Sequence, residues 1–179
     1  MIFEDHPSPK KLSDQGNPAV VIYFIEELKN LYGMEKDLLE VLGRFQKQVH
    51  TEEFIQVLIK YSSVTSKNIE RLEQVFVLAD IPISSKNSPL LQGLMQECKS
   101  ATEKGEKDMA SDLKLSILTA HFNSIHLAIH TQLLALTRKM QLHELTVLLQ
   151  ENILEEKNIG STIESCIHIE LISKLQGLG

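Results

Sequence analysis

The stretch LSILTAHFNSIHLAIHTQLLALT, residues 115–137, decides the fold, because it is long, mostly apolar and free of Asp, Glu, Lys and Arg. Its length would suit a membrane span. It nevertheless carries three histidines, two side-chain amides and five hydroxyls, which a lipid-facing helix would leave unsatisfied. We therefore interpret it as the central helix of a soluble bundle, buried over most of its circumference.

This central stretch shows two stripes at helical spacing. The apolar stripe comprises Leu115, Leu118, Phe122, Ile125, Ile129, Leu133 and Leu136. The polar stripe comprises Ser116, Thr119, Asn123, His126, His130 and Thr137. Because an unpaired buried polar group costs roughly 1–3 kcal/mol, the polar stripe predicts polar partners on the other helices. Those partners either complete a hydrogen-bond network or include the ligands of a metal.

Composition narrows the class of protein. A chain of 179 residues suits one domain with a sizeable core. The net charge of −6 and the lack of a basic stripe argue against a nucleic-acid partner. With only two cysteines and no secretory signal peptide, we expect a reducing cytoplasm, no membrane partner, and Cys98 and Cys166 as small buried groups.

Helix-start signals divide the chain. Asn17-Pro18 supplies an N-cap and a proline at the first helical position, so residues 1–16 are predicted as an N-terminal arm and 17–179 as the bundle domain. Within the first helix, Glu35 interrupts an apolar stripe. Thr51, followed by two glutamates, is predicted to cap the second helix with its hydroxyl.

The connection from Ile81 to Lys107 sets the topology. It is long, and Ser88-Pro89 starts a short helix within it. A long crossover lets the second and third long helices run parallel, whereas a short loop would make them antiparallel. A tight junction near Gln141 leads into the last long helix, where Glu156 again lies in an apolar stripe. We predict an all-α, ferritin-like, up-down-down-up four-helix bundle, with an additional short helix in the crossover.

Several ordered segments resemble a known family. The segment LKNLYGMEKDL at 28–38 carries the strongest likeness, supported by RLEQVF at 71–76, QGLMQE at 92–97, LLQE at 148–151 and LEEK at 154–157. Together they resemble the YciF-like group of ferritin-like proteins over roughly residues 20–170. The resemblance implies a bundle of the di-iron carboxylate kind.

The family's ligand positions are largely altered in this chain. The resemblance places a carboxylate at Glu35 and another at Glu156. It implies further ligands at positions 63 and 66, 123 and 126, and 160, which hold Ser63, Ser66, Asn123, His126 and Gly160. Serine and glycine cannot offset the charge of two divalent irons, so the sequence predicts that the di-iron site is lost.

Two interpretations of the centre remain open. Glu35, His126 and Glu156, with His130 one turn beyond, are the candidate metal residues, because His and carboxylate ligands suit a single Fe, Mn or Zn ion. Alternatively, the same residues form a metal-free hydrogen-bond network. We expect no catalytic residues, no cofactor other than that possible single ion, and a non-enzymatic structural, interaction or stress-related role. The alternative is a metal-binding protein or oxidoreductase. The resemblance and the abundant apolar residues also predict a homodimer.

Overall fold

Five α-helices and a terminal π-helix form the described part of the chain. The computed structural model describes residues 12, 17–86, 89–103 and 108–173. The α-helices are α1 (Pro18–Gln48), α2 (Glu52–Leu78), α3 (Pro89–Glu103), α4 (Met109–Lys139) and α5 (His143–Ser165), and the π-helix η2 (Cys166–Ile172) follows. Within these ranges, no helix combines the length and the apolar character that crossing a membrane requires.

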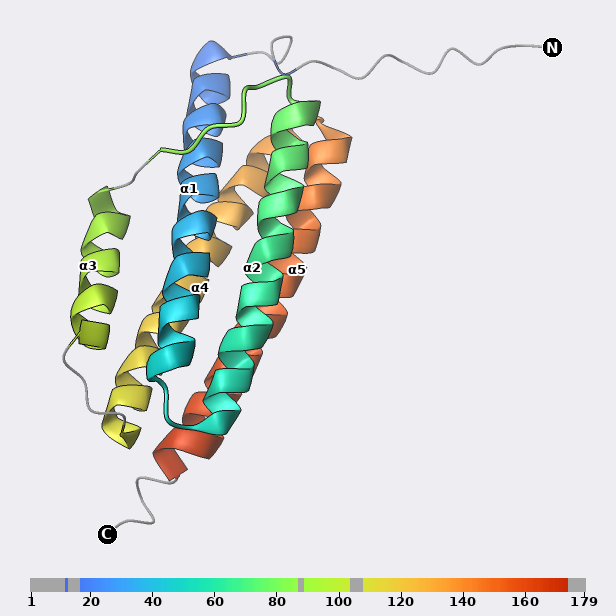
Figure 1. Cartoon of the computed structure of the whole chain (residues 1–179). Helices are drawn as coiled ribbons and strands as arrows, with labels where there is room; N and C mark the ends of the chain where they lie inside the picture. The colour runs from blue at the N-terminus through green and yellow to red at the C-terminus, as the bar shows by residue number, and fades with distance from the viewer. Residues whose placement is uncertain (1–11, 13–16, 87–88, 104–107, 174–179) are drawn as a thin grey trace.

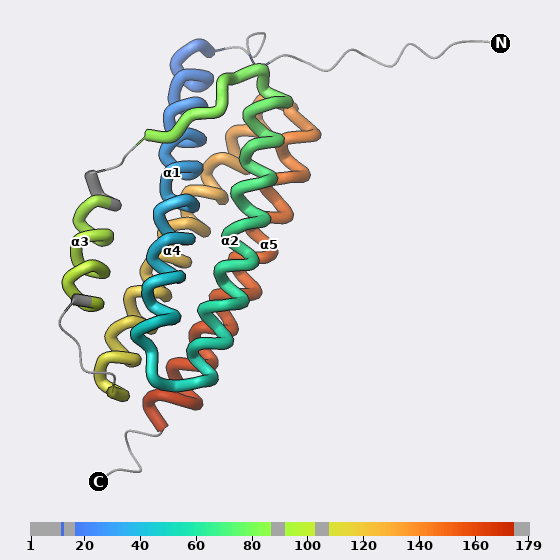
Figure 2. Tube along the Cα trace, viewed as in Figure 1, coloured from blue at the N-terminus to red at the C-terminus, as the bar shows by residue number. Residues whose placement is uncertain are grey.

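The four long helices form the predicted bundle. In Figure 1, α1 and α5 run in one direction, and α2 and α4 run in the other. The main contacts place the helices in the cyclic order α1, α2, α5, α4, so that the parallel pairs lie across the diagonals. The trace in Figure 2 shows how the crossover after α2 passes α1 and leads into α3, which packs against α1 and α4. The predicted all-α, up-down-down-up arrangement is confirmed.

A neighbouring residue stabilises the start of α1, whereas a distant residue binds the turn before α2. The Asn17 side chain accepts a hydrogen bond from Ala19 N at 3.0 Å, which confirms the predicted cap of α1. Thr51 occupies the N-cap of α2, but its hydroxyl does not cap the helix. Instead Asp112 of α4, wholly buried, accepts hydrogen bonds from His50 N at 2.9 Å and Thr51 N at 2.7 Å. Thr51 is therefore the N-cap residue as predicted, but the predicted hydroxyl cap is wrong, and the buried Asp112 instead binds the turn that precedes α2.

The ends of α2 and α4 share one geometry. Asp80 and Gln141 both adopt positive φ, at 58° and 56°. After each of them, a backbone N–H reaches back to a carbonyl five residues earlier, from Ile81 to Phe76 and from Leu142 to Thr137. This left-handed ending reverses the chain quickly, which is how α4 joins the antiparallel α5.

The core consists of two apolar clusters. The first lies at the end where α1 begins and includes Leu12, Phe24, Leu28, Leu31, Leu72, Phe76, Leu133, Leu145 and Leu149. The second lies at the opposite end and includes Leu38, Leu42, Phe45, Phe54, Leu58, Leu118, Phe122, Ile159 and Ile163. Both cysteines are buried, as predicted, and neither is in a disulfide. Between the clusters lies a layer of buried polar side chains.

A segment at residues 81–86 crosses α1 closely. Lys86 N donates to Lys29 O at 3.1 Å, and Lys86 also forms an ion pair with Glu26. A Cβ atom at Gly33 would lie 2.8 Å from Lys86 O and 3.4 Å from Ser85 Cβ. The glycine therefore allows the crossover to lie against α1.

Two glycines of α1 offer a matched test of this close approach. Gly33→Ala should lower the free energy of unfolding by about 1–2 kcal/mol, because backbone must move to admit the methyl group. A Cβ atom at Gly43 would meet nothing within 4 Å. Gly43→Ala should therefore raise the free energy of unfolding by about 0.5–1 kcal/mol through helix propensity. Urea denaturation measures both. Equal gains in stability would show that the crossover does not depend on Gly33.

Candidate metal centre

The polar stripe of α4 lies within the buried face of the helix. Its six members are all buried, whereas Ile125, Ile129 and Leu136 of the apolar stripe are half-buried. The hydroxyls of Ser116, Thr119 and Thr137 donate to carbonyls of their own helix, at 2.8, 2.8 and 3.0 Å. Only Asn123, His126 and His130 therefore need partners on other helices.

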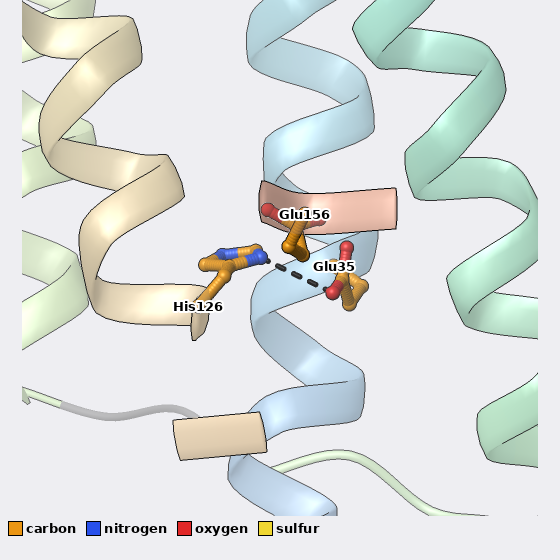
Figure 3. Close-up of side chains that lie close together, drawn as sticks. All are labelled: Glu35, His126 and Glu156. Carbon is orange, nitrogen blue, oxygen red and sulfur yellow. Dashed lines mark ion pairs between the residues drawn. The ribbon is translucent and has the colours of Figure 1, made fainter. Parts of the chain in front are cut away.

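Three of the candidate residues meet in the middle of the bundle. Glu35 of α1, His126 of α4 and Glu156 of α5 each offer a ligand atom, and these atoms lie within 4.8 Å of one another (Figure 3). All three side chains have zero exposure. His126 Nδ1 lies 3.2 Å from Glu35 Oε1. His130, one turn further along α4, places Nε2 3.0 Å from the same carboxylate oxygen.

Helix α2 contributes residues that the sequence analysis did not single out. Ser63 is exposed and Ser66 half-buried, while Tyr61, Thr65 and Asn68 point inward. The ligand positions 63 and 66 that the resemblance implied therefore do not face the centre. The spacing of Phe54, Leu58, Tyr61, Thr65, Asn68, Leu72 and Phe76 would have revealed the inward face, because all lie on one helical stripe.

Helix α5 shows a similar difference beside Glu156. The residue one turn beyond Glu156 that faces the core is Ile159, which is wholly buried. Gly160 instead lies against α4, where an added Cβ would be 2.4 Å from Asn123 Oδ1. Gly160 therefore lets Asn123 approach α5 closely.

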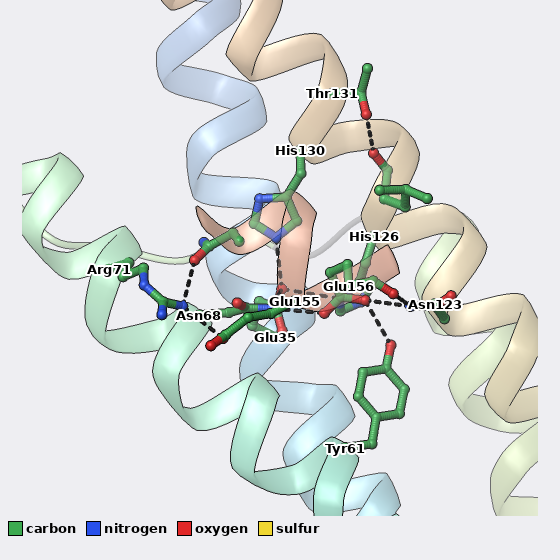
Figure 4. Close-up of polar contacts among 12 residues, drawn as sticks. Glu35, Tyr61, Asn68, Arg71, Asn123, His126, His130, Thr131, Glu155 and Glu156 are labelled. Carbon is green, nitrogen blue, oxygen red and sulfur yellow. Dashed lines mark hydrogen bonds and ion pairs between the residues drawn. The ribbon is translucent and has the colours of Figure 1, made fainter. Parts of the chain in front are cut away.

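Amide and hydroxyl donors surround the Glu156 carboxylate (Figure 4). Asn68 Nδ2 donates to Oε1 at 2.7 Å and also to Glu35 Oε1 at 3.3 Å. Asn123 Nδ2 donates to Oε2 at 2.6 Å and to the Glu156 backbone carbonyl at 2.9 Å. Tyr61 OH donates to Oε2 at 3.3 Å. The two carboxylates are thereby joined through Asn68.

Several polar atoms around the centre nevertheless lack a hydrogen-bond partner. They are Glu35 Oε2, Thr65 Oγ1, Asn68 Oδ1, both ring nitrogens of His126 and His130 Nδ1. The contact between His126 Nδ1 and Glu35 is close enough for an ion pair but lacks hydrogen-bond geometry. Two ligands of one tetrahedral ion at about 2.1 Å would lie about 3.4 Å apart, which is close to the separation of these two atoms.

The surroundings of Glu35 and Glu156 shift the pKa values of the two carboxylates in opposite directions. Burial raises the pKa of Glu35, but His126 and His130 outweigh burial and lower that pKa to about 2. Burial and the charge of Glu35 raise the pKa of Glu156 to about 7. Burial lowers the pKa of His126, while Glu35 and Glu156 raise it by more. In the metal-free centre the lowered pKa of Glu35 and the raised pKa of His126 both favour an ion pair between these two side chains.

The donor set suits one divalent ion better than two. Two carboxylates and one imidazole neutralise a single divalent charge and match the ligands of Zn, Fe or Mn. Around them, the inward positions on α2, α4 and α5 hold Thr65, Asn68, Asn123 and Ile159, which offer no further carboxylate. A pair of irons would have to share the two carboxylates of Glu35 and Glu156.

Comparisons with known proteins agree with the fold, an all-α four-helix bundle. The chain belongs to the family described as "Domain of unknown function (DUF892)", whose model matches residues 22–174. No curated protein sequence matches the chain significantly. The predicted YciF-like membership is thus confirmed.

Two solved structures share the fold. The Escherichia coli stress protein YciF is 23% identical with a TM-score of 0.82, over 88% of this chain and 99% of that one. YcfI from Rhodopseudomonas palustris is 22% identical with a TM-score of 0.70, over 89% of this chain and 97% of that one. At these identities the likeness establishes the fold.

The shifted pKa values predict how stability depends on pH. The pKa of Glu156 is raised above its ordinary 4.5, so its contribution is complete below pH 4.5 and is lost as the pH rises through about 7. The raised pKa of His126 acts in the same direction. These two groups make the free energy of unfolding of metal-free protein fall between about pH 5 and pH 8, while the lowered pKa of His130 offsets part of that fall. Glu156→Gln should reduce this fall by an amount on the order of 2 kcal/mol.

Glu155→Gln is the matched control for this measurement. Arg71 lowers the pKa of Glu155, so its contribution changes only at acid pH. Chemical denaturation at a series of pH values in the presence of a chelator should give this variant the wild-type slope above pH 5. Parallel curves for wild type and Glu156→Gln would contradict the prediction.

Proposed function

We propose that this protein is a non-enzymatic, metal-binding bundle protein that holds one divalent first-row transition-metal ion. Glu35, His126 and Glu156 are its ligands, and His130 supports Glu35 from the neighbouring turn. The observation that carries the proposal is the convergence of three wholly buried ligand atoms within 4.8 Å, among polar atoms that lack partners. An ion at this point would satisfy several of those atoms at once.

The same geometry argues against a di-iron centre. Two divalent ions would bring about four positive charges into the core, and bridging carboxylates normally offset such charge. Glu35 and Glu156 supply at most two negative charges. Thr65, Asn68, Asn123 and Ile159 add none. We therefore propose that the di-iron site implied by the family resemblance is replaced by a single-ion site.

Burial supports a role other than catalysis. A catalytic metal keeps a coordination position open for substrate, whereas a structural metal is closed by protein. Here Glu35, His126 and Glu156 have zero exposure, and Tyr61 and Asn68 beside them are also wholly buried. The likeness to the E. coli stress protein YciF supports a role in stress, exercised through the stability of the bundle or through holding the ion.

A metal-free network is the second candidate. Asn68, Asn123 and Tyr61 donate four hydrogen bonds to the Glu156 side chain and the shared Glu35 oxygen, at distances from 2.6 to 3.3 Å. The ion pair between Glu35 and His126 balances the remaining charge. In this state the centre fixes the packing of the four helices without a ligand.

Metal loading separates the two candidates. After anaerobic incubation with Fe(II), Mn(II) or Zn(II) and removal of excess ion, elemental mass spectrometry should find about one ion per chain. The Glu35→Ala/His126→Ala variant should lose it. His121→Ala is the matched control, because His121 lies exposed on the same helix and should leave loading unchanged. Specific binding should also raise the melting temperature of wild type.

Three other outcomes of the metal-loading experiment would contradict the proposed single-ion site. Two ions per chain would overturn the single-ion assignment and restore a dinuclear centre. Wild-type protein that retains no more metal than the double variant would overturn the metal proposal and favour the network. Equal loss of metal in His121→Ala would show that the ion binds outside the centre.

A further inference from the structure

The proposed ion site is enclosed on all sides by the bundle, so an ion must pass between helices to reach it. The two apolar clusters close the bundle above and below the polar layer. Between α4 and α5 the backbone at Gly160 lies against Asn123, too close to admit a Cβ. Beside α1 and α4 the satellite helix α3 packs against both.

At the seam between α2 and α5, a line of polar side chains runs from the surface to the centre. Exposure falls inward along this line, from 55% for the Glu151 side chain to 25% for Glu155 and 17% for Arg71. Asn152 comes next and is wholly buried. Asn152 lies one helical turn from Glu156, and Arg71 lies one turn from Asn68.

Arg71 closes this seam by joining its two helices (Figure 4). Its Nε donates to Glu151 Oε2 at 3.0 Å, and its Nη1 donates to Glu155 Oε2 at 2.9 Å and to Asn152 Oδ1 at 3.1 Å. On the inner side, Asn152 Nδ2 and His130 Nδ1 are buried without a hydrogen-bond partner. Asn152, which accepts a hydrogen bond from Arg71, therefore keeps an unsatisfied donor, and His130 keeps an unsatisfied ring nitrogen in the polar layer.

Arg71 places a positive charge in the seam, between the surface and the buried Asn152. This guanidinium must repel an arriving cation. Once Arg71 swings outward, Glu151 and Glu155 present two carboxylates that attract a divalent ion, and Asn152 offers its carbonyl oxygen on the way inward.

We infer that the α2–α5 seam at Arg71 is the route by which a divalent cation enters and leaves the bundle, with Arg71 as its gate. This inference rests on the proposed single-ion site. Arg71 is a positioning residue that sets the rates of exchange, because it neither ligates the ion nor touches its ligands Glu35, His126 and Glu156. Removing it should change uptake and release together while leaving the number of bound ions at one.

The test uses Co(II) as a spectroscopic probe, with uptake followed by stopped-flow visible absorption and release followed after addition of EDTA. Arg71→Met keeps much of the side-chain bulk but removes the charge and the hydrogen bonds. It should speed both uptake and release by about tenfold, within the range of electrostatic effects on ion association. Arg138→Met is the matched control, because Arg138 is exposed on α4 and bonds to Gln150 outside the route.

A second variant should obstruct the route and therefore slow the exchange of the ion. Asn152→Leu fills a similar volume with an apolar group and should slow uptake severalfold, with the final content still one ion per chain. If uptake and release of Co(II) in both variants stay within twofold of wild type, at unchanged metal content, Arg71 is not a gate. That result would leave the proposed ion site unaffected. Wild-type protein that binds no Co(II) would overturn the proposed function itself, together with this inference.

Discussion

A single carboxylate oxygen, Glu35 Oε1, holds the middle of the bundle together. It lies 3.0 Å from His130 Nε2, 3.2 Å from His126 Nδ1 and 3.3 Å from Asn68 Nδ2, so that α1, α2 and α4 meet at one atom. Removing an ionised carboxylate from water costs several kcal/mol unless partners surround it. Those partners are in place only when the helices sit in their observed register. The polar layer therefore selects one packing from the several that two apolar clusters alone would permit.

Charge balance makes this layer suited to two states. Without a metal, the lowered pKa of Glu35 and the raised pKa of His126 favour an ion pair, and the pKa of Glu156, raised to about 7, favours its protonated form below neutral pH. With one divalent ion, the two carboxylates would carry the neutralising charge, and His126 must be neutral in order to bind. In each case opposite charges offset one another inside the core. The chain can thus keep the same fold whether the centre acts as a network or as an ion site.

The sequence predicted the architecture because its signals are local and strong. Asn17-Pro18 and the long connection from Ile81 to Lys107 define the helices and their directions. Glu35 and Glu156 stood out because a carboxylate interrupts each apolar stripe. Asn68 and Tyr61 did not, because α2 mixes small polar residues on adjacent faces, and a shift of one residue changes which of them point inward. The contacts of Arg71 and Asp112 join residues 61 to 84 positions apart, so no local pattern reveals them.

The hydrogen bonds that Asp112 accepts make the two halves of the chain depend on each other. The backbone N–H groups of His50 and Thr51, in the α1–α2 turn, find their acceptor on α4, beyond the entire crossover. A hairpin of α1 and α2 formed early in synthesis would lack this acceptor. The carboxylate of Asp112, in turn, can be buried only after that turn exists. Folding of the bundle should accordingly be a cooperative event that waits for α4, with no independently stable first half.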